Sequence, residues 1–174
     1  MNSKTTTTSA TFTKKQQKFL STFTSPIKYF LFLLTQVPMG LVCGMKVREV
    51  TLTACTTYLP FRWINKNPFA SIYFAVQSMA AELSTAALGV LALYEAEESI
   101  AFILVDMKAE FHKKAVKGIT FTCEMGEEIR ETVKKASLST EAQTITAKTV
   151  GKMADGTIVS EFYFTWSFKK RSKS

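Results

Sequence analysis

The chain has 174 residues, of which 47 % are hydrophobic and 21 % charged. This composition is typical of one globular domain with a core, and it excludes a disordered or fibrous chain. The formal net charge of +8 favours anionic partners. The basic residues are spread in small clusters. No helix-turn-helix, zinc or aromatic RNA-binding signature is visible in the sequence, so we do not expect nucleic acid to be a partner.

The cysteines are Cys43, Cys55 and Cys123, and the chain has a single histidine. Three widely separated cysteines without a CxxC or Cys/His spacing predict neither a disulfide framework nor a metal site. We therefore expect a reduced, cytoplasmic protein that needs no metal and no separate cofactor.

Residues 1–13 are rich in Thr and Ser, which predicts a loose N-terminal tail before a single domain over 14–174. A short basic helix is expected from Lys14 to Phe23. Ser25-Pro26 has the residue types of a helix start and predicts a second helix to about Thr35. A turn is expected at Pro38-Met39-Gly40, so that helices occupy residues 14–38.

Residues 27–45 are strongly apolar and contain no carboxylate. A membrane-spanning helix needs about 20 apolar residues, so this stretch is of borderline length. Pro38 would break such a helix in its middle. We therefore predict that the stretch does not span a membrane.

The next expected elements are one strand and one long helix. The strand runs over 46–59, where β-branched residues alternate with others, and Pro60 ends it. After a loop over 61–66, Asn67-Pro68 predicts a helix start with a cap residue followed by proline. The helix body, which extends to about Leu93, is apolar on nearly every face. Such a helix should be buried nearly all round.

An acidic turn over 95–98 leads into four more predicted strands. Turn signals at Lys117-Gly118 and Asp155-Gly156 separate some of them by hairpin-length connections, which favour an antiparallel sheet. The strands are expected over 101–112, 118–125, about 139–150, and 158–170. The sequence thus predicts an α+β domain whose curved antiparallel sheet wraps around one long buried helix.

This pattern resembles the hot-dog superfamily of acyl-CoA thioesterases and dehydratases, and in particular its phenylacetic-acid-type (PaaI-like) thioesterase branch. The likeness covers about residues 40–170. Three stretches carry it: Asn65-Lys66-Asn67-Pro68-Phe69-Ala70-Ser71 at the helix start, Asp106 to Gly118, and the Asp155-Gly156 hairpin with the strand that follows.

The resemblance implies a homodimer or tetramer that hydrolyses an acyl-CoA, or a similar thioester, between subunits. The chain departs from the family pattern at two places. Phe69-Ala70-Ser71 stands where the family has His-Gly-Gly. Ser78 stands where the family often has a catalytic acid, and the nearest acid is Glu82, one turn further on.

The predicted helix start is the first candidate site. Free N–H groups and the helix dipole at such a start favour negative charge, including the oxyanion that develops on a thioester carbonyl. Asn67, Ala70 and Ser71 are the candidates there, with Ala70 and Ser71 as donors. The alternative is that Asn67 is only a cap and Ser71 only a small residue in a tight contact.

A polar stripe on the apolar helix is the second candidate site. Ser71, Ser78, Glu82 and Thr85 share one face, because they lie seven, four and three residues apart. Burial would raise the pKa of Glu82, which suits a general base that activates water. Gln77 and Ser78 would orient the water or the carbonyl. Alternatively, small polar residues permit close packing between helices, and Glu82 pairs with an arginine.

Basic residues near the helix start could bind the phosphates of coenzyme A, which would enter only as part of the substrate. The alternative is ordinary surface charge. The candidates are Arg62, Lys66, Lys113, Lys114 and Lys117.

We therefore predict a thioesterase. A hot-dog protein that binds acyl thioesters or lipids without turnover is the main alternative. A membrane-associated protein that uses residues 27–45 is a second. A dehydratase is disfavoured, because the helix start lacks the histidine that such enzymes use.

Overall fold

The computed structural model describes residues 12–172. Of the predicted loose tail, residues 1–11 lie outside this range. Thr13 lies within it, and its side chain accepts a hydrogen bond from the Gln16 N–H at 3.2 Å, which caps the first helix. This helix, α1, spans Lys14–Thr24, so the predicted basic helix is confirmed.

Two further helices follow α1. Helix α2 spans Pro26–Gln36, with Ser25 as its cap and proline at its first position, as the sequence predicted. Where a turn was predicted, the chain forms the short helix α3, Pro38–Cys43. The turn prediction is wrong because Pro38 starts a new helix instead of only ending the old one. Helix α3 ends at Gly44, whose φ of 69° lies in the left-handed region.

The single strand predicted over 46–59 is a hairpin, made of β1 (Lys46–Val50) and β2 (Cys55–Leu59). The turn between them depends on Thr51. Its backbone N–H donates to the Ala54 carbonyl at 2.8 Å, and its side-chain oxygen accepts from the Ala54 N–H at 2.9 Å. A threonine hydroxyl can organise a turn in this way, so the chain reverses without the Gly or Pro that would have marked the turn in the sequence.

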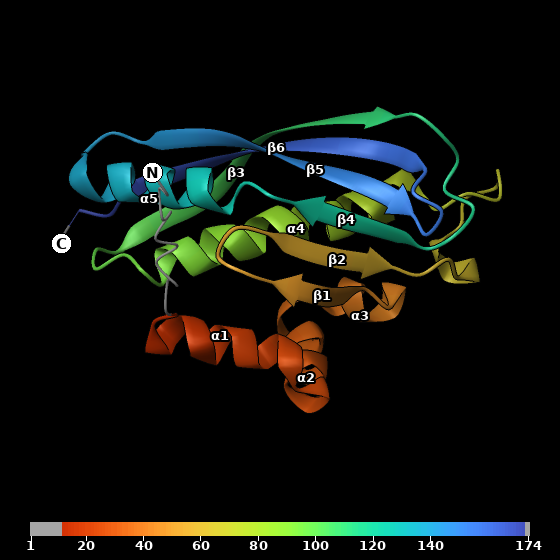
Figure 1. Cartoon of the computed structure of the whole chain (residues 1–174), viewed down its shortest axis with the longest axis horizontal. Coiled ribbons are helices and arrows are strands. Elements are labelled where there is room, and N and C mark those ends of the chain that lie inside the picture. The colour runs from red at the N-terminus through yellow and green to blue at the C-terminus, as the bar shows by residue number, and fades with distance from the viewer. Residues whose placement is uncertain (1–11, 173–174) are drawn as a thin grey trace, which may run out of the picture.

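Six antiparallel strands form one curved sheet in the order β1-β2-β4-β5-β6-β3 (Figure 1). The later strands confirm the predicted ones, with small changes at their ends. Strand β3 follows the long helix and lies at one edge, and β1 lies at the other. The strands are β3 (Ile100–Phe111), β4 (Ile119–Cys123), β5 (Gln143–Met153) and β6 (Ile158–Lys170).

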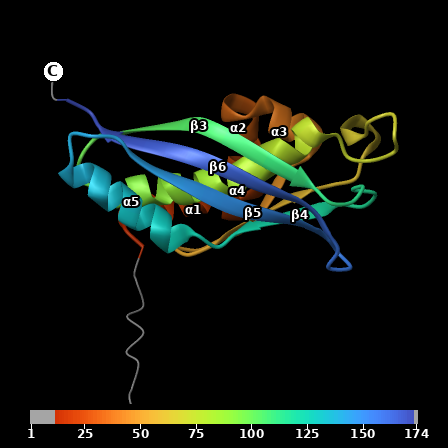
Figure 2. The ribbon, with the colours of Figure 1, turned by 90° about the horizontal axis from the view of Figure 1, so that it is seen from above.

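The long helix α4 spans Phe74–Leu93, so the predicted start at Asn67-Pro68 is wrong. Residues 67–71 form a separate loop, described below. The sheet lies over α4 (Figure 2). Most of the helix is buried, as predicted, but Ala75, Ser78, Met79, Glu82 and Ala86 form a partly exposed stripe. The protein therefore covers α4 on most sides and leaves one stripe open.

Helix α5, Gly126–Leu138, occupies a segment for which the sequence analysis assigned no element. Its buried residues Ile129, Val133 and Ala136 lie four and three apart, which is the spacing of one helical face. The signal was therefore present in the sequence. The helix packs against α4 and closes one end of the core (Figure 1).

Aromatic side chains of the sheet form the surface on which α4 packs. Phe162, Phe164, Trp166 and Phe168 alternate along β6 and are buried. Phe121 of β4 joins them, with its ring centroid 5.8 Å from that of Phe162. Because alternate residues of a strand face the same side, β6 presents one continuous aromatic row to the helix.

Polar groups on α4 make specific bonds to this sheet. Ser84 donates to the Thr149 hydroxyl at 2.8 Å, and the Trp166 indole N–H donates to the Thr85 hydroxyl at 3.0 Å. Both contacts are buried. The polar residues Ser84 and Thr85 are thus structural, and they fix the rotation of α4 about its axis.

Within residues 12–172, α4 is the one helix long and apolar enough to cross a membrane by length and composition. Its burial inside the domain explains that composition, because a core helix is equally apolar. The apolar stretch 27–45 is divided between α2 and α3, in agreement with the prediction that it does not span a membrane.

Replacing Thr85 by valine should leave the buried Trp166 N–H without an acceptor. We expect the free energy of unfolding to fall by about 1–3 kcal/mol, measured by urea denaturation. In a Trp166→Phe background, which has no N–H to satisfy, the same Thr85→Val change should cost much less. Equal costs in both backgrounds would show that the hydrogen bond is not the cause.

Candidate functional site

The loop before α4 is closed by Asn67. The Asn67 side-chain oxygen accepts hydrogen bonds from the N–H groups of Phe69 and Ser71 at 3.0 and 3.2 Å. Its backbone N–H donates to the Ser71 carbonyl at 2.8 Å. Asn67 is therefore a loop-forming residue and not the cap of α4.

Ala70 and Ser71, the predicted oxyanion donors, lie in this loop and not on the helix. The Ala70 N–H donates to the Asn67 carbonyl at 3.1 Å, and the Ser71 N–H donates to the Asn67 side chain. Both donors are thus engaged within the loop. Ala70 has a φ of 55°, a left-handed conformation that costs about 1–2 kcal/mol for a residue with a Cβ.

The actual start of α4 has no side-chain cap. Tyr73 is the N-cap residue, and its carbonyl accepts from the N–H groups of Val76 and Gln77 at 3.1 Å. Among residues 12–172, no partner is found for the N–H groups of Phe74 and Ala75, the first two of the helix. These two donors, together with the positive end of the helix dipole, favour a bound oxyanion.

A pocket of about 620 Å³ lies at this helix start. Pockets for small molecules commonly measure roughly 300–1,000 Å³. Two segments form it, the loop and first turn of α4 on one side and the end of β3 on the other. It is lined by Asn67, Pro68, Phe69, Ser71, Ile72, Tyr73, Phe74, Gln77, Phe111, His112, Lys113 and Lys114.

Several aromatic rings of the pocket are open to solvent. Phe69 is 72 % exposed, and Phe74 and Phe111 are about half exposed. The rings of Phe74 and Phe111 meet edge to face, with centroids 6.5 Å apart. Exposed aromatic clusters of this kind mark binding surfaces, and they fit an apolar ligand group better than a polar one.

Along with Ser71, Gln77 is one of the two buried polar residues that line the pocket. Its side-chain nitrogen donates to the Ile72 carbonyl at 2.9 Å, and its side-chain oxygen accepts from the Ser160 hydroxyl at 2.9 Å. These bonds hold the amide in one orientation. They also tie the first turns of α4 to β6.

Ser78 and Glu82 do not line the pocket. Both lie on the partly exposed stripe of α4, and the Ser78 hydroxyl donates back to the Phe74 carbonyl at 3.1 Å. Burial raises the pKa of the Glu82 carboxyl above its usual value. The structure therefore separates the three residues predicted to act together, with Gln77 in the pocket and the other two on a different face.

The five basic residues predicted to bind coenzyme A also lie in different places, some at the pocket and some away from it. Lys113 and Lys114 line the pocket, and so does His112. Lys66 lies over the Phe61 ring, 4.5 Å from its centroid, and Lys117 pairs with Asp155 at 3.2 Å. Arg62 lines a different pocket beside α2. Only two of the five residues thus meet the helix start.

His112 also belongs to a charged group on the outer face of the sheet. With Glu110 and Glu161 it forms a cluster that could hold a metal ion. Each carboxylate already has a cationic partner, Lys108 at 2.7 Å from Glu110 and Lys148 at 2.9 Å from Glu161. Because two lysines compete for these oxygens, the cluster is better described as an ion-pair network.

The three cysteines are buried free thiols. Burial is the main cause that raises the pKa of Cys55 to about 12 and that of Cys123 to about 11. Thiols with such pKa values stay protonated and are poor nucleophiles. The candidate site therefore has no cysteine nucleophile.

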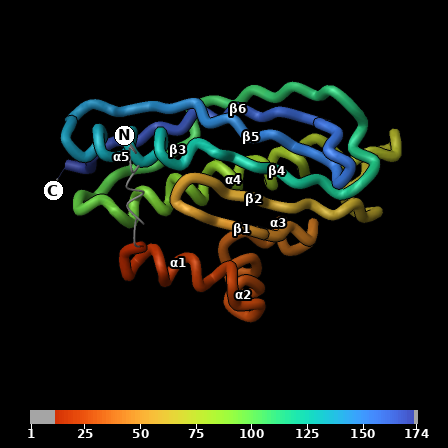
Figure 3. Tube along the Cα trace, in the orientation of Figure 1, coloured from red at the N-terminus to blue at the C-terminus, as the bar shows by residue number. Residues whose placement is uncertain are grey.

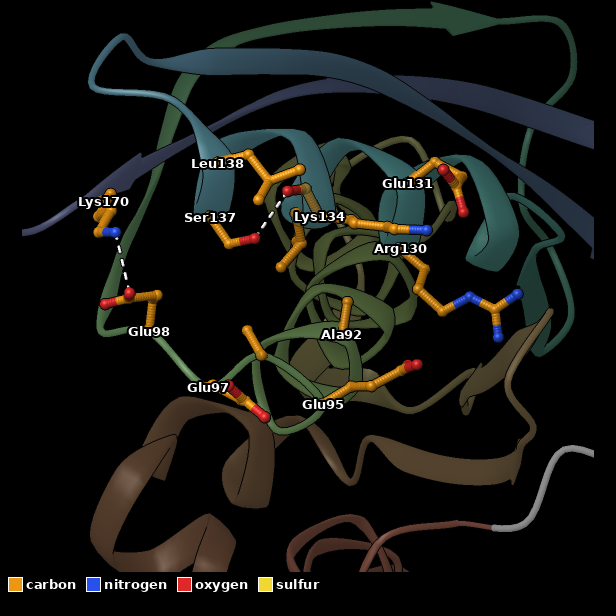
Figure 4. Close-up of a pocket in the computed structure, with 12 residues that line it drawn as sticks. Ala92, Glu95, Glu97, Glu98, Arg130, Glu131, Lys134, Ser137, Leu138 and Lys170 are labelled. Atoms are coloured by element: carbon orange, nitrogen blue, oxygen red, sulfur yellow. Dashed lines mark hydrogen bonds and ion pairs between the residues drawn. The ribbon is translucent and has the colours of Figure 1, made fainter.

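A larger pocket, of about 760 Å³, lies at the opposite end of α4. Figure 4 shows its walls, with Glu95 following α4, Arg130 and Lys134 on α5, and the Glu98–Lys170 ion pair of 2.9 Å at one side. Charges of both signs alternate around it, and none of the predicted site residues lines it. It offers no uncapped helix start and no single sign of charge for a ligand.

Sequence reasoning missed the aromatic residues Tyr73, Phe74 and Phe111, which line the pocket at the helix start. It also missed Ser160, which lies outside the lining and holds Gln77. For Phe111 the sequence contained a weak signal of a site, because Phe111 and His112 stand at the end of a predicted strand. Ser160 gave none, since a serine within a strand is unremarkable until the fold brings it to Gln77.

Comparisons with known proteins bear on the fold of the chain. No family model matches the sequence, and no curated protein matches it. Solved structures do match. A protein of unknown function from Pseudomonas aeruginosa, described as a probable thioesterase, has a TM-score of 0.68 at 16 % identity, over 84 % of this chain and 97 % of that one.

Two further structures are similar. A thioesterase from Haemophilus influenzae has a TM-score of 0.58 at 12 % identity, over 80 % of this chain and 88 % of that one. A protein of unknown function from Chlorobaculum tepidum has a TM-score of 0.69 at 11 % identity, over 84 % of this chain and 98 % of that one. Identities this low establish the fold alone, and the chain has the hot-dog fold that the resemblance predicted.

Proposed function

We propose that the protein is an acyl-thioester hydrolase whose substrate carbonyl binds at the start of α4. One observation carries the proposal: an uncapped helix start faces a pocket with aromatic walls and a cluster of basic residues. Aromatic walls fit an acyl group, free N–H groups fit a developing oxyanion, and basic residues fit a phosphate-bearing carrier.

The oxyanion donors in this proposal are the N–H groups of Phe74 and Ala75. Water attacks the thioester carbonyl, and the negative charge that develops on the oxygen is stabilised by these fixed donors and the helix dipole. Such donors are typically worth about 3–4 kcal/mol. The tetrahedral intermediate then collapses, and the C–S bond breaks to release the thiol and the carboxylic acid.

Glu82 is the general base of the proposal, and a second copy of the chain supplies it. Within one copy Glu82 lies outside the pocket. The pocket includes Phe111 to Lys114, at the end of edge strand β3. Two copies that pair through β3 would place each pocket at the interface, where the open stripe of the partner's α4 can complete it. A carboxylate with a raised pKa suits proton removal from water near neutral pH.

Strand β3 supports this assembly. It is 12 residues long and forms a sheet edge, with Ile103 62 %, Val105 54 % and Met107 45 % exposed. A long, apolar, unpaired edge is usually covered by another chain. Isologous pairing of two β3 strands would satisfy both edges at once.

His112, Lys113 and Lys114 are the proposed contacts for the phosphates of coenzyme A or of a similar carrier. All three are exposed and follow one another at the pocket. Lysine ammonium groups attract phosphate as point charges. Arg62, Lys66 and Lys117 are not part of this proposal, because their contacts place them elsewhere.

A protein that binds acyl thioesters without hydrolysing them is the second candidate function. The position of Glu82 favours it, since the carboxylate lies outside the pocket of a single copy. If Glu82 of the second copy does not reach the pocket, the helix start can still bind a thioester. It then lacks a base to activate water, and no hydrolysis follows.

The activity test measures free-thiol release from a panel of acyl-CoA substrates of increasing chain length. We expect the wild type to turn over at least one of them, and Glu82→Gln to lower kcat by about 100-fold or more. Glu141→Gln, at an exposed position before β5, is the matched control and should keep full activity. Binding of the substrates without turnover by the wild type would support the second candidate and exclude the hydrolase.

Pairing of two copies through β3 can be tested separately. Ile103→Lys places a charge on the exposed side of β3 and should convert a dimer to a monomer in sedimentation velocity, with loss of thiol release. Leu138→Lys introduces the same charge on α5, at a residue that is 84 % exposed, and should change neither property. A wild-type protein that sediments as a monomer at assay concentrations would contradict the shared site.

The raised pKa of Glu82 predicts how stability depends on pH. Burial disfavours the charged carboxylate, so the folded protein carries a cost that is absent at low pH and appears as pH rises through the raised pKa. Glu82→Gln removes this cost. The variant should gain stability over the wild type between about pH 4 and pH 7, as measured by denaturant unfolding. A constant difference across this range would mean that Glu82 titrates normally.

A further inference from the structure

Helix α2 has an apolar face that the domain does not cover. Ile27 is 73 % exposed, Phe30 and Leu31 are each 50 % exposed, and Leu34 is 48 % exposed. Their spacing of three, four and seven residues places all four on one side of the helix. Soluble proteins normally turn such a stripe inward, so its outward orientation requires an explanation.

The opposite side of α2 already attaches the helix to the domain. Leu33 is buried, and the Tyr29 hydroxyl donates to the Met45 carbonyl at 3.0 Å and accepts from the Val47 N–H at 3.1 Å. The helix is therefore held by its inner side, and its outer stripe contributes nothing to the core.

The neighbouring helix α3 also has exposed apolar side chains, with Met39 58 % and Val42 49 % exposed. Helices α1, α2 and α3 lie together beyond the β1 edge of the sheet, on the side away from β5 and β6 (Figures 1 and 3). We name the exposed side chains of Ile27, Phe30, Leu31, Leu34, Met39 and Val42 the outer apolar face.

The segment that carries this face has charged residues of one sign. The first 48 residues of the sequence contain seven of the 22 basic residues and none of the 14 carboxylates, so they carry seven of the eight net positive charges. Within the described region these basic residues are all exposed: Lys14, Lys15, Lys18, Lys28, Lys46 and Arg48. The basic residues themselves are spread along the whole chain, and the asymmetry arises because acidic residues begin only at Glu49.

We propose that the outer apolar face docks on an anionic phospholipid membrane surface, with α2 lying in the plane of the interface. Apolar side chains enter the boundary between headgroups and acyl chains, and the surrounding lysines contact anionic headgroups. An exposed apolar stripe bordered by cations is the pattern of interfacial helices.

Length excludes a spanning helix here. Helix α2 has 11 residues, which at about 1.5 Å per residue is far shorter than a hydrocarbon core of about 30 Å. Charge argues against a second copy as the occupant, because a symmetric interface would bring two sets of the same cations together.

A groove beside the outer apolar face fits the same partner. It has a volume of about 470 Å³ and lies between α2, α3 and β1. Phe30 belongs to both surfaces. The groove walls are mainly apolar, and Lys46 and Arg62 add positive charge beside them, as an acyl chain and an anionic headgroup would require.

The test is co-sedimentation of the full chain with two kinds of vesicle, pure phosphatidylcholine and phosphatidylcholine with about 30 mol % phosphatidylserine. We expect the wild type to bind the anionic vesicles at least tenfold more tightly, with binding that weakens as salt increases. Equal binding to both kinds, or to neither, would overturn the proposal.

Two variants test the two parts of the surface. Ile27→Gln with Leu31→Gln removes apolar area, and Lys14→Gln with Lys15→Gln and Lys18→Gln removes charge. Each should weaken binding to anionic vesicles at least tenfold. The matched controls lie on α5: Leu138→Gln, and Lys134→Gln with Lys135→Gln, all at exposed residues, should bind like the wild type.

Circular dichroism and sedimentation velocity accompany each variant. Glutamine keeps the helix propensity and all changed side chains are exposed, so the fold and the oligomeric state should be unchanged. If the Ile27→Gln, Leu31→Gln variant instead dissociates an oligomer, the outer apolar face is a protein interface and the proposal is overturned. The membrane test reads vesicle binding and the hydrolase test reads thiol release. A negative result in one therefore leaves the other proposal intact.

Discussion

The packing of α4 against the aromatic row of β6 is the interaction on which the rest of this protein depends. A helix without a polar face cannot remain in water, and a flat sheet would cover only one side of it. The curved sheet and α5 together cover most of it. The buried bonds from Ser84 and Thr85 to the sheet then select one rotation of the helix, which determines which side chains stay on the open stripe.

That rotation also determines the chemistry the protein offers. It directs Gln77 into the pocket at the helix start, where Ile72 and Ser160 hold its amide. It directs Glu82 to the open stripe, where partial burial raises the carboxyl pKa. The binding groups and the candidate base are thus separated on one chain. In the proposed hydrolase, a second chain at the β3 edge would bring them together.

Two apolar surfaces remain open after folding, and their charge distinguishes their partners. The β3 edge combines exposed Ile103 and Val105 with unpaired backbone groups and charges of both signs, which suits another copy of the same strand. The outer apolar face of α2 and α3 belongs to a segment whose charged residues are all cations, which suits an anionic surface. The same hydrophobic effect drives both contacts, and electrostatics selects the partner.

The sequence by itself determined the main elements and the fold class. Alternation in β6 and all-round apolarity in α4 follow from local periodicity, which does not depend on distant contacts. The spacing of apolar residues also marks α5, although no element was predicted there. Tertiary structure decided the rest. Thr51 formed a turn without glycine or proline, and Asn67 closed a loop and so moved the helix start to Phe74. Which candidates share one pocket depended on contacts such as that of Ser160 with Gln77, 83 residues apart, and no local pattern encodes such a contact.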